Sequence, residues 1–378
     1  MRTIKSMMQT PIAAMLMTAA LVYSATARSD YQIETLTEGL QYPWALAFLP
    51  DGRMLVTERV GRLRIIEADG TLQDKPVIGV PMGYQAAQAG LMDVALDPDF
   101  RTEPWVYLSL AYGRIDANNT RLIRGRLVED RLEDVETLFD AYPAKAGSSH
   151  YGGRIAFLPD KTLVLTLGDG FDYREQAQNL DNHLGTLVRL TREGDAPQDN
   201  PFYGRTGMAN EVYSYGHRNV QGIAYDKKNS RLFINEHGPR GGDEINLIEP
   251  GGNYGWPLAT FGVDYTGAQV TPFQSQPNTI APLVDWTPSI APSALVVYDG
   301  ELFPEWQGDL FSAALVAKEV RRVRLADGQP VEQQTLFAEL DERIRDVRVG
   351  PDGALYLLTD SAEGRLLKVT PADKSNSD

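Results

Sequence analysis

The stretch Trp44-Ala-Leu-Ala-Phe-Leu-Pro-Asp-Gly-Arg-Met-Leu-Val-Thr-Glu58 decides the fold of this chain. Two short apolar runs flank Pro-Asp-Gly, and apolar runs bounded by such residues are typical of strands. In the turn, proline presets φ, aspartate bonds its own backbone, and glycine accepts a positive φ. The stretch therefore predicts a β-hairpin.

The same pattern recurs along the chain. The further copies pair 94–100 with 105–110, 154–160 with 163–167, 222–229 with 231–235, 294–299 with 308–312, and 347–353 with 354–359. A hairpin repeated at this spacing indicates propeller blades. We expect an all-β, six-bladed propeller with four-stranded antiparallel blades, forming a single domain over residues 28–370. The last strand, 365–370, should join 31–36 in one blade and close the ring, which removes exposed sheet edges. A two-domain β protein is the alternative.

Composition limits the function. With 36 Lys and Arg against 51 Asp and Glu, the formal net charge of the 378-residue chain is 36 − 51 = −15. No basic field exists to meet phosphates, so nucleic acid is not an expected partner. Cysteine is absent, which excludes disulfides, thiolate metal sites and cysteine nucleophiles.

The N-terminus has the pattern of a signal peptide. Arg2 and Lys5 precede an apolar run over 11–23, and Ala25-Thr26-Ala27 supplies a small-x-small cleavage site. We expect residues 1–27 to be cleaved near Ala27, giving a periplasmic chain with net charge −15 − 2 = −17. The alternatives are a membrane anchor or a buried helix, but the run is short for a span, which needs roughly 20 residues. The mature form should therefore have no membrane span, and residues 371–378 should form a disordered tail.

Two loops carry candidate chemistry. His150 lies before a strand in Ser-Ser-His-Tyr-Gly-Gly-Arg, where glycines allow a ligand to approach closely, and a neutral imidazole accepts a proton near pH 7. It is a candidate base, or a loop histidine that caps a backbone. Arg218 and Asn219 follow His217 and offer a guanidinium and an amide suited to a carboxylate or quinone oxygen. A surface turn is the alternative.

Two further segments suggest a metal and an anion. Residues 235–244, Asn-Glu-His-Gly-Pro-Arg-Gly-Gly-Asp-Glu, combine a Gly-Pro corner with acidic residues, and calcium prefers carbonyl and carboxylate oxygens. A decorated β-turn is the alternative. Arg343 and Arg345 alternate on one face of an extended run. Their partner is either a local carboxylate, such as Asp341 or Glu342, or a polyanionic cofactor. No P-loop, G-x-S-x-G elbow or dinucleotide-binding fingerprint is present.

Taken together, these motifs resemble those of a known enzyme family. They read, in order, Y-P-W-A-L-A-F-L-P-D-G, G-L-M-D-V-A-L-D-P-D-F, H-Y-G-G-R, Y-G-H-R-N-V-Q-G, E-H-G-P-R-G-G-D-E-I-N, G-G-N-Y-G-W-P, A-P-S-A-L and R-I-R-D-V-R-V-G-P-D-G. Over about residues 33–370 the chain resembles the soluble, calcium- and pyrroloquinoline-quinone (PQQ)-dependent sugar dehydrogenases. The nearest branch is the periplasmic aldose sugar dehydrogenases of the glucose/sorbosone dehydrogenase family. That family also folds as a six-bladed propeller.

The resemblance implies oxidation of an aldose at C1 to the lactone, with the electrons passing through PQQ to an external acceptor. It implies that His150 is the general base, with Gln88 beside cofactor and substrate and Arg218 near the quinone oxygen. The other implied cofactor contacts are Asn219, Tyr265, Lys318, Arg343 and Arg345. Asp169 and Trp286 correspond to residues around the substrate, with Trp286 over the cleft, and Asp243, like Asp169, corresponds to an acidic residue near the site. The carbonyls of Gly238 and Pro239 correspond to ligands of the cofactor calcium, and Glu244 with the Tyr254 carbonyl to ligands of a second calcium.

Two positions depart from the family pattern. An aspartate that binds sugar precedes the base in the glucose dehydrogenases, and Ser149 stands there in this chain. We therefore expect a looser pocket that accepts several aldoses. The family lysine after a small-Leu pair is replaced by Val316, with Lys318 two residues later.

Two other functions compete with the dehydrogenase. A calcium-dependent lactonase would need acidic and amide ligands converging on a channel metal, and a non-enzymatic propeller would bind a protein or glycan without a cofactor. A monomer is favoured.

Overall fold

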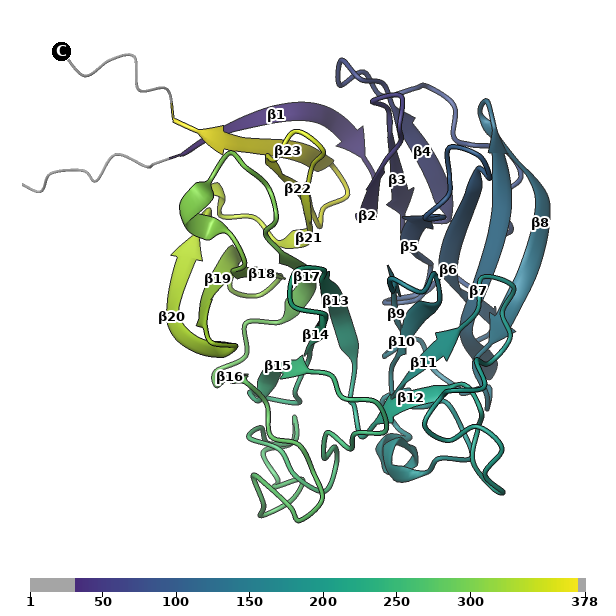
Figure 1. Ribbon diagram of the computed structural model, residues 1–378, viewed down its shortest axis with the longest axis vertical. Coiled ribbons are helices and arrows are strands. Elements are labelled where there is room, and N and C mark those ends of the chain that lie inside the picture. The colour runs from purple at the N-terminus through teal and green to yellow at the C-terminus, as the bar shows by residue number, and fades with distance from the viewer. Residues whose placement is uncertain (1–30, 373–378) are drawn as a thin grey trace, which may run out of the picture.

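The computed structural model describes residues 31–372. Their strands form six antiparallel sheets arranged as blades around an axis (Figure 1). Three short 3-10 helices, η1 (Arg174–Gln178), η2 (Pro304–Trp306) and η3 (Ala338–Leu340), lie in the connections. The prediction of an all-β six-bladed propeller is confirmed.

The blades are numbered here in chain order. Blade one holds β2 (Pro43–Phe48), β3 (Met54–Glu58) and β4 (Arg62–Ile66); blade two holds β5 (Leu91–Leu96), β6 (Trp105–Arg114), β7 (Ala117–Val128) and β8 (Arg131–Asp140); blade three holds β9 (Gly152–Phe157), β10 (Leu163–Leu167), β11 (Thr186–Leu190) and β12 (Val212–Tyr215). Blade four holds β13 (Val220–Asp226), β14 (Arg231–Glu236), β15 (Asp243–Leu247) and β16 (Val284–Trp286); blade five holds β17 (Pro292–Val297), β18 (Leu310–Ala314), β19 (Glu319–Ala326) and β20 (Gln329–Leu336); blade six holds β21 (Ile344–Val349), β22 (Leu355–Thr359), β23 (Gly364–Pro371) and β1 (Tyr31–Leu40).

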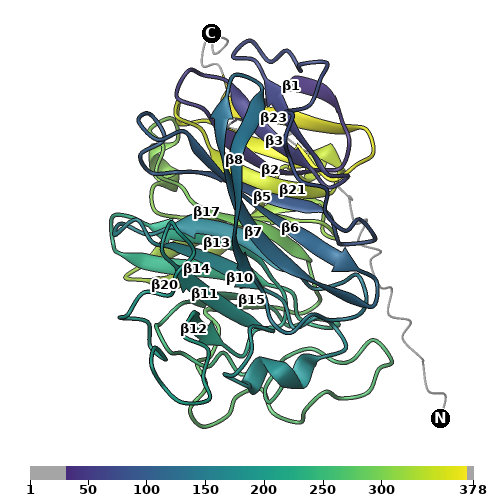
Figure 2. The same cartoon turned by 90° about the vertical axis from the view of Figure 1, so that its right-hand side faces the viewer.

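The six hairpins predicted from the sequence are the first two strands of the six blades. The first of these is β2 paired with β3, in register from Pro43 opposite Glu58 to Phe48 opposite Met54. Five blades have four strands. Blade one has three, and a single antiparallel bridge from Ile66 to Leu72 stands in the place of a fourth. Figure 2 shows blade two across the front of the molecule.

The ring closes as expected. β1 and β23 pair antiparallel, with Tyr31 opposite Pro371 and Glu34 opposite Lys368, and the two strands lie side by side in Figure 1. β23 extends one residue past the predicted end of the domain. The predicted signal peptide and residues 373–378 of the predicted tail lie outside the described residues. No helix within 31–372 is long and apolar enough to cross a membrane.

Apolar side chains pack between neighbouring blades, in clusters that each draw on two adjacent sheets, such as the one that joins Leu55 and Ile65 of blade one to Leu108 and Ile123 of blade two. Such packing of one sheet face on another supplies the main driving force for the fold. The innermost strands β2, β5, β9, β13, β17 and β21 each contact the next around the axis.

At the axis, polar side chains replace the apolar core. Arg154 of β9 is 2% exposed, and its three nitrogens all donate hydrogen bonds. Its partners belong to the other five blades: the Gln221 carbonyl at 2.7 Å, the Ser293 carbonyl at 2.5 Å, the Asp346 carboxylate at 2.9 Å, Asp93 at 3.6 Å, and the Trp44 ring at 4.0 Å from the guanidinium carbon.

A second arginine completes this arrangement. Arg348 donates to Asp346 at 2.8 Å and to Asp93 at 2.9 Å, so two guanidinium groups face two carboxylates. We call Asp93, Arg154, Asp346 and Arg348 the Arg154 hub. A buried charge group of this kind is tolerated because every member is paired and hydrogen-bonded. Through Arg154 the hub ties all six blades together, and two of the residues that Arg154 contacts, Trp44 and Gln221, line the cavity described below.

Candidate active site

His150 and Asp169 form a buried pair at one end of the axis. His150 immediately precedes Tyr151 and β9, and Asp169 lies just after β10, so both come from the top of blade three. The His150 backbone is left-handed, with φ +56°, and such strain in a bulky residue is typical of functional sites. Its Nδ1 lies 2.7 Å from Asp169 Oδ1. Because a carboxylate only accepts, the proton of the neutral imidazole lies on Nδ1 and leaves a lone pair on Nε2.

The surroundings keep Asp169 ionised and in place. Its Oδ2 accepts a hydrogen bond from Trp256 Nε1 at 2.9 Å, and its Oδ1 accepts one from the Phe171 amide at 2.8 Å. Burial opposes ionisation, but the hydrogen bond from His150 and the charge of Arg218 outweigh it and hold the pKa of Asp169 below its usual range. Nε2 of His150 accepts no hydrogen bond anywhere in residues 31–372.

Burial also sets the charge of the histidine. Desolvation lowers the pKa of His150 below its ordinary value of 6.5, although the nearby Asp169 opposes this shift. His150 is therefore neutral at pH 7, with a free Nε2 that can take a proton. Gln88 fixes the backbone of this residue, because its Oε1 accepts the His150 amide at 2.9 Å.

Arg218 and Asn219 lie beside this pair, between β12 and β13. The Arg218 guanidinium donates to the carbonyls of His237, at 3.2 Å, and Gly238, at 2.6 Å. It lies 5.3 Å from the Trp256 ring centre and 5.7 Å from that of Tyr265. Asn219 Oδ1 accepts the Gly152 amide at 3.2 Å, which links the loop to the start of β9.

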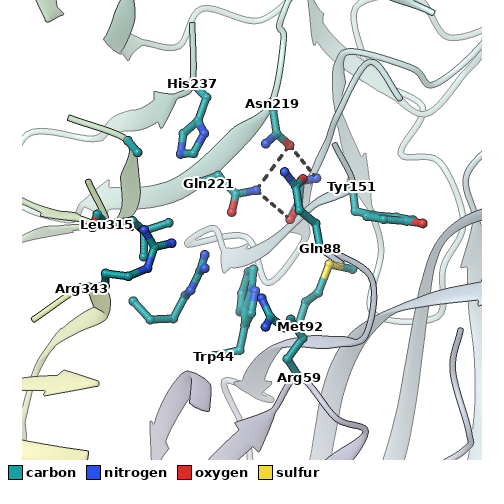
Figure 3. A pocket seen from close by; sticks show the side chains of 13 residues that line it. Trp44, Arg59, Gln88, Met92, Tyr151, Asn219, Gln221, His237, Leu315 and Arg343 are labelled. Atoms are coloured by element: carbon teal, nitrogen blue, oxygen red, sulfur yellow. Dashed lines mark hydrogen bonds between the residues drawn. The ribbon is translucent and has the colours of Figure 1, made fainter. Parts of the chain in front are cut away.

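A cavity of about 190 Å³ lies next to these residues (Figure 3). Gln88 and Asn219 line it, whereas His150, Asp169 and Arg218 do not. Its lining consists of Trp44, Arg59, Gln88, Met92, Tyr151, Gly152, Asn219, Gln221, His237, Ala291, Leu315, Arg343 and Arg345. Three of the lining residues are arginines and none is a carboxylate, in a chain with net charge −15. Burial lowers the pKa of His237 to about 4, so this histidine is neutral. The cavity is therefore suited to an anion.

Asp360 is the carboxylate that pairs with the two predicted arginines. It accepts hydrogen bonds from Arg343 and Arg345, each at 3.1 Å. The local carboxylates considered from the sequence are engaged elsewhere, Asp341 with Lys318 and Glu342 with Arg365. One carboxylate serves two arginines, and the Nε of Arg345 is buried with no hydrogen-bond partner within the described residues. This orphaned donor fits a carboxylate of a bound molecule.

Lys318 lies next to the cavity, not in it. Its ammonium donates to Asp341 at 2.8 Å and its side chain is 42% exposed. It lines a separate pocket of about 720 Å³, whose wall also includes Arg343. The structure therefore places Lys318 outside the group formed by Arg343 and Arg345.

Trp286 requires a correction. We expected it over the cleft, but it lies on the outermost strand of blade four, buried against Ile245, Leu295 and Leu310. Its indole nitrogen donates to Gln333 at 2.8 Å. The aromatic groups at the site are Trp256, Phe171 and Tyr265, which line a second pocket of about 260 Å³ next to Arg218. The last two rings are stacked with centres 6.2 Å apart.

The Gly-Pro corner lies at the edge of the cavity. The Gly238 amide donates to Asp243 at 3.0 Å, and Asp243 also accepts from Ser289, Ile290 and Ala291. The Gly238 carbonyl accepts from Arg218, whereas the Pro239 carbonyl accepts no hydrogen bond within residues 31–372. No group of three or more His, Asp or Glu side chains in the described residues converges on a metal position. A metal at this corner would therefore be bound through the two backbone carbonyls.

Glu244 and Tyr254 lie further out in blade four, on β15 and in the loop between β15 and β16. In the sheet Glu244 stands opposite Glu236 on one side and Asp285 on the other. Like charges directly opposite each other are unfavourable, and burial, followed by the charge of Glu236, raises the pKa of Glu244 well above its usual range. Asn246 donates to both glutamates, yet its own Oδ1 is buried with no partner in the described chain. Carboxylate and carbonyl oxygens are the ligands that calcium prefers, although these three carboxylates do not converge on one metal position in the described residues.

Comparison with known proteins decides the family. The sequence profile described as glucose/sorbosone dehydrogenase matches residues 40–368. Aldose sugar dehydrogenase YliI of Escherichia coli is 42% identical over 351 residues, which cover 91% of this chain and 94% of that protein. This chain belongs to the glucose/sorbosone dehydrogenase family. It is an oxidoreductase of a sugar-dehydrogenase family.

Solved structures of family members agree with this assignment. The E. coli soluble aldose sugar dehydrogenase in its apo-form superposes with a TM-score of 0.87 at 41% identity, covering 90% of this chain and all of that one. The PQQ-bound form of aldose sugar dehydrogenase from Streptomyces coelicolor superposes with a TM-score of 0.74 at 30% identity, covering 90% and 99%. Quinoprotein glucose dehydrogenase B of Acinetobacter calcoaceticus is 28% identical, over 89% of this chain and 87% of that protein.

The family resemblance did not indicate several residues of the site. Trp256, Asp360, Arg59 and the Arg154 hub were missed. Trp256 lies in the quoted Gly-Trp-Pro motif and Arg154 ends His-Tyr-Gly-Gly-Arg, so both had a signal in the sequence. Asp360 directly follows β22 and faces Arg343, which precedes β21 on the same hairpin; its amide donates to the Arg343 carbonyl at 2.7 Å, but it stands in none of the quoted motifs. Ser149, at the position where the family's glucose dehydrogenases have aspartate, is half-buried beside His150, and its hydroxyl makes no hydrogen bond in the described chain.

Proposed function

We propose that the chain is a PQQ- and calcium-dependent aldose dehydrogenase that oxidises sugars at C1 to the lactone. The single observation that carries the proposal is the cavity: three arginines and an orphaned guanidinium nitrogen lie next to a neutral, carboxylate-held histidine with a free Nε2. An anionic redox cofactor fits the first part and a hydroxyl substrate fits the second.

The residues present fit the cofactor. Arg343 and Arg345 would hold carboxylates of PQQ, Asn219 would contact it, and Arg218 would lie near its oxygen that gains charge. Tyr265 would line the cofactor pocket, and the carbonyls of Gly238 and Pro239 would bind its calcium. When bound, PQQ with its calcium supplies an acceptor for a hydride and a Lewis acid that polarises the accepting carbonyl.

The proton is handled by this chain's own residues. His150 Nε2 accepts the proton of the sugar C1 hydroxyl as the hydride leaves the same carbon. Asp169 holds Nδ1–H and stabilises the imidazolium that results. Trp256 and the Phe171 amide keep the carboxylate in place through bonds of 2.9 Å and 2.8 Å. Gln88 holds the strained His150 backbone, and the bond to Asp169 orients the ring.

The remaining proposals concern calcium, the substrate, location and assembly. We infer a second calcium at Glu244 and the Tyr254 carbonyl, supported by the row of facing carboxylates. Ser149 favours several aldoses over a strict preference for glucose. We infer export to the periplasm by residues 1–27, transfer of electrons to an external acceptor, and a monomer.

The proposal is tested by dye-linked oxidation. Purified protein reconstituted with PQQ and calcium chloride should reduce an electron-accepting dye when given each member of a panel of aldoses, and should not do so when either PQQ or the sugar is omitted. Absence of dye reduction with every aldose would overturn the proposal. Hydrolysis of a lactone without PQQ would favour the lactonase instead, although arginines occupy the cavity where that enzyme needs acidic ligands.

A further inference from the structure

Arg59 is the third arginine of the cavity, and nothing in the family resemblance assigned it a role. It directly follows β3 of blade one, whereas Arg343 and Arg345 belong to blade six and the loop before it. In Figure 3 its side chain lies beside Trp44 and Met92, on a different wall of the cavity from Arg343. The three guanidinium groups therefore reach the cavity from two neighbouring blades.

The Arg59 side chain has no polar partner in residues 31–372. Its guanidinium carbon lies 4.7 Å from the centre of the Tyr42 ring, and its backbone amide donates to the Tyr42 carbonyl at 3.0 Å. Within the described residues it makes no ion pair and its nitrogens donate no hydrogen bond. A half-buried arginine normally finds a carboxylate or a carbonyl, as Arg343 and Arg345 do with Asp360.

Its position is fixed by the fold and not by a charge partner. The Gly90 carbonyl accepts from Ala111, and the Leu91 amide donates to the Arg59 carbonyl at 3.3 Å. A Cβ at Gly90 would come within 2.7 Å of Arg59 Cγ and 2.0 Å of its carbonyl oxygen. Glycine at this position thus makes room for the Arg59 stem between blades one and two, and the guanidinium is left free to meet a ligand.

The charge balance indicates what that ligand is. Asp360 supplies one negative charge for Arg343 and Arg345, and Arg59 adds a third positive charge near the same carboxylate, whose pKa burial raises but the three arginines hold below its usual range. The local excess is therefore two positive charges. A ligand with a single carboxylate would leave part of it unmatched, whereas a ligand with several carboxylates would satisfy it.

We propose that Arg59 binds a carboxylate of the PQQ held in this cavity, opposite the carboxylates that Arg343 and Arg345 hold. The inference rests on the proposed function, because it requires PQQ to be the ligand. It adds blade one to the binding site, so that the cofactor is clamped across the seam between blades one and six. A guanidinium suits this task because it can donate two parallel hydrogen bonds to one carboxylate.

The test is calorimetric titration of PQQ into the full chain with calcium present, without any sugar or dye. Arg59→Gln should weaken PQQ binding about 10- to 100-fold, the range expected for loss of a charge-assisted hydrogen bond. Arg59→Lys, which keeps the charge but loses the fork, should fall between Gln and the wild type. The dependence of the dissociation constant on salt should also be less steep in Arg59→Gln.

Arg53→Gln is the matched control. Arg53 lies in the same β2–β3 hairpin, pairs with Asp51 at 2.8 Å and does not line the cavity. Its substitution therefore removes the same charge from the same blade without touching the proposed binding site. Its PQQ affinity should stay within about twofold of the wild type. Thermal melts of all variants check folding, and if Arg59→Gln does not fold, Arg59→Lys decides the question.

The two failures can be told apart. If the wild type binds PQQ and both Arg59 variants bind it with dissociation constants within twofold of the wild type, the role of Arg59 is overturned and the proposed function is not. Equal weakening in Arg53→Gln would also overturn it, because the effect would then be one of net charge. A wild type that takes up no PQQ would overturn the proposed function and this inference with it.

Discussion

Two groups of arginines meet the axis of this propeller, and they differ in what they leave unpaired. In the Arg154 hub all three nitrogens of Arg154 donate, and Asp93 and Asp346 balance Arg154 and Arg348. In the adjoining cavity Arg345 has a buried Nε without a partner in the described chain, and the Arg59 guanidinium makes no hydrogen bond or ion pair within residues 31–372. Arginine therefore holds the blades together in the hub, whereas in the cavity it is free to bind an anion.

The largest effect should come from substitution of His150, which lies beside the cavity arginines and is proposed to be the general base. His150→Ala should lower kcat about 10²- to 10⁴-fold, the range for loss of a general base, while the affinity for PQQ stays unchanged. Dye-linked rates and calorimetry on the same samples measure both. His183→Gln is the control, because His183 bonds to the Tyr142 amide away from the cavity and its loss should leave kcat unchanged. An active His150→Ala enzyme would refute the assignment of the base.

The hub should respond in stability instead of chemistry. Arg154→Met leaves Asp93 and Asp346 with one buried cation between them, and breaking such a group should lower the free energy of unfolding by about 3–5 kcal/mol. Urea denaturation followed by tryptophan fluorescence measures this change. A decrease in unfolding free energy of less than about 1 kcal/mol would show that the hub does not hold the blades together. It would then not differ from the cavity arginines in its effect on stability.

The cavity arginines should behave in the opposite way. Arg345→Gln removes a guanidinium that burial already disfavours, as the lowered pKa of Arg345 indicates, and Asp360 keeps its bond to Arg343. Arg345 and Asp360 are both buried, but Asp360 keeps one arginine, so the free energy of unfolding should fall by about 1 kcal/mol, the net value of one hydrogen bond, while PQQ should bind about 10- to 100-fold more weakly. Destabilisation as large as that of Arg154→Met would contradict the distinction between the two groups.

The smallest effect is a shift in pH dependence. The neutral form of His150 is the base, and burial lowers its pKa below 6.5, so kcat/KM should fall as pH falls through a midpoint below 6.5. Asp169 favours the protonated form, so Asp169→Asn should move this midpoint to still lower pH, in addition to reducing the rate. A midpoint at or above 6.5 in the wild type, or an upward shift in the variant, would contradict the buried pair.

The fold was predictable because its signal is local. The turn after Phe48 and its five counterparts each specify a hairpin from a few adjacent residues, and six hairpins with a closing strand leave little choice of architecture. The open fourth position of blade one was not predictable, because the chain after Ile66 forms a single bridge and not a strand.

The site was predictable only in part, because much of it is non-local. His150, Arg218 and Arg345 stand in motifs and were found, but Trp256 reaches Asp169 across 87 positions of sequence. Asp360 lies opposite Arg343 on the β21–β22 hairpin, but it stands outside every quoted motif and so had no signal of its own. The resemblance predicted that Trp286 lies over the cleft, whereas it packs with Leu295 and Leu310 in the core. Similarity to a motif identifies a residue but does not determine whether its side chain is exposed.

The most direct test of the account is the absorbance of PQQ bound to the chain, recorded before and after an aldose is added without any dye. With calcium present, the wild type should bind PQQ, and the aldose should convert the quinone absorbance to that of the reduced cofactor. His150→Ala should bind PQQ equally well and should not show the change on the same time scale. Bound PQQ whose absorbance stays unchanged in the wild type with every aldose would contradict the central claim.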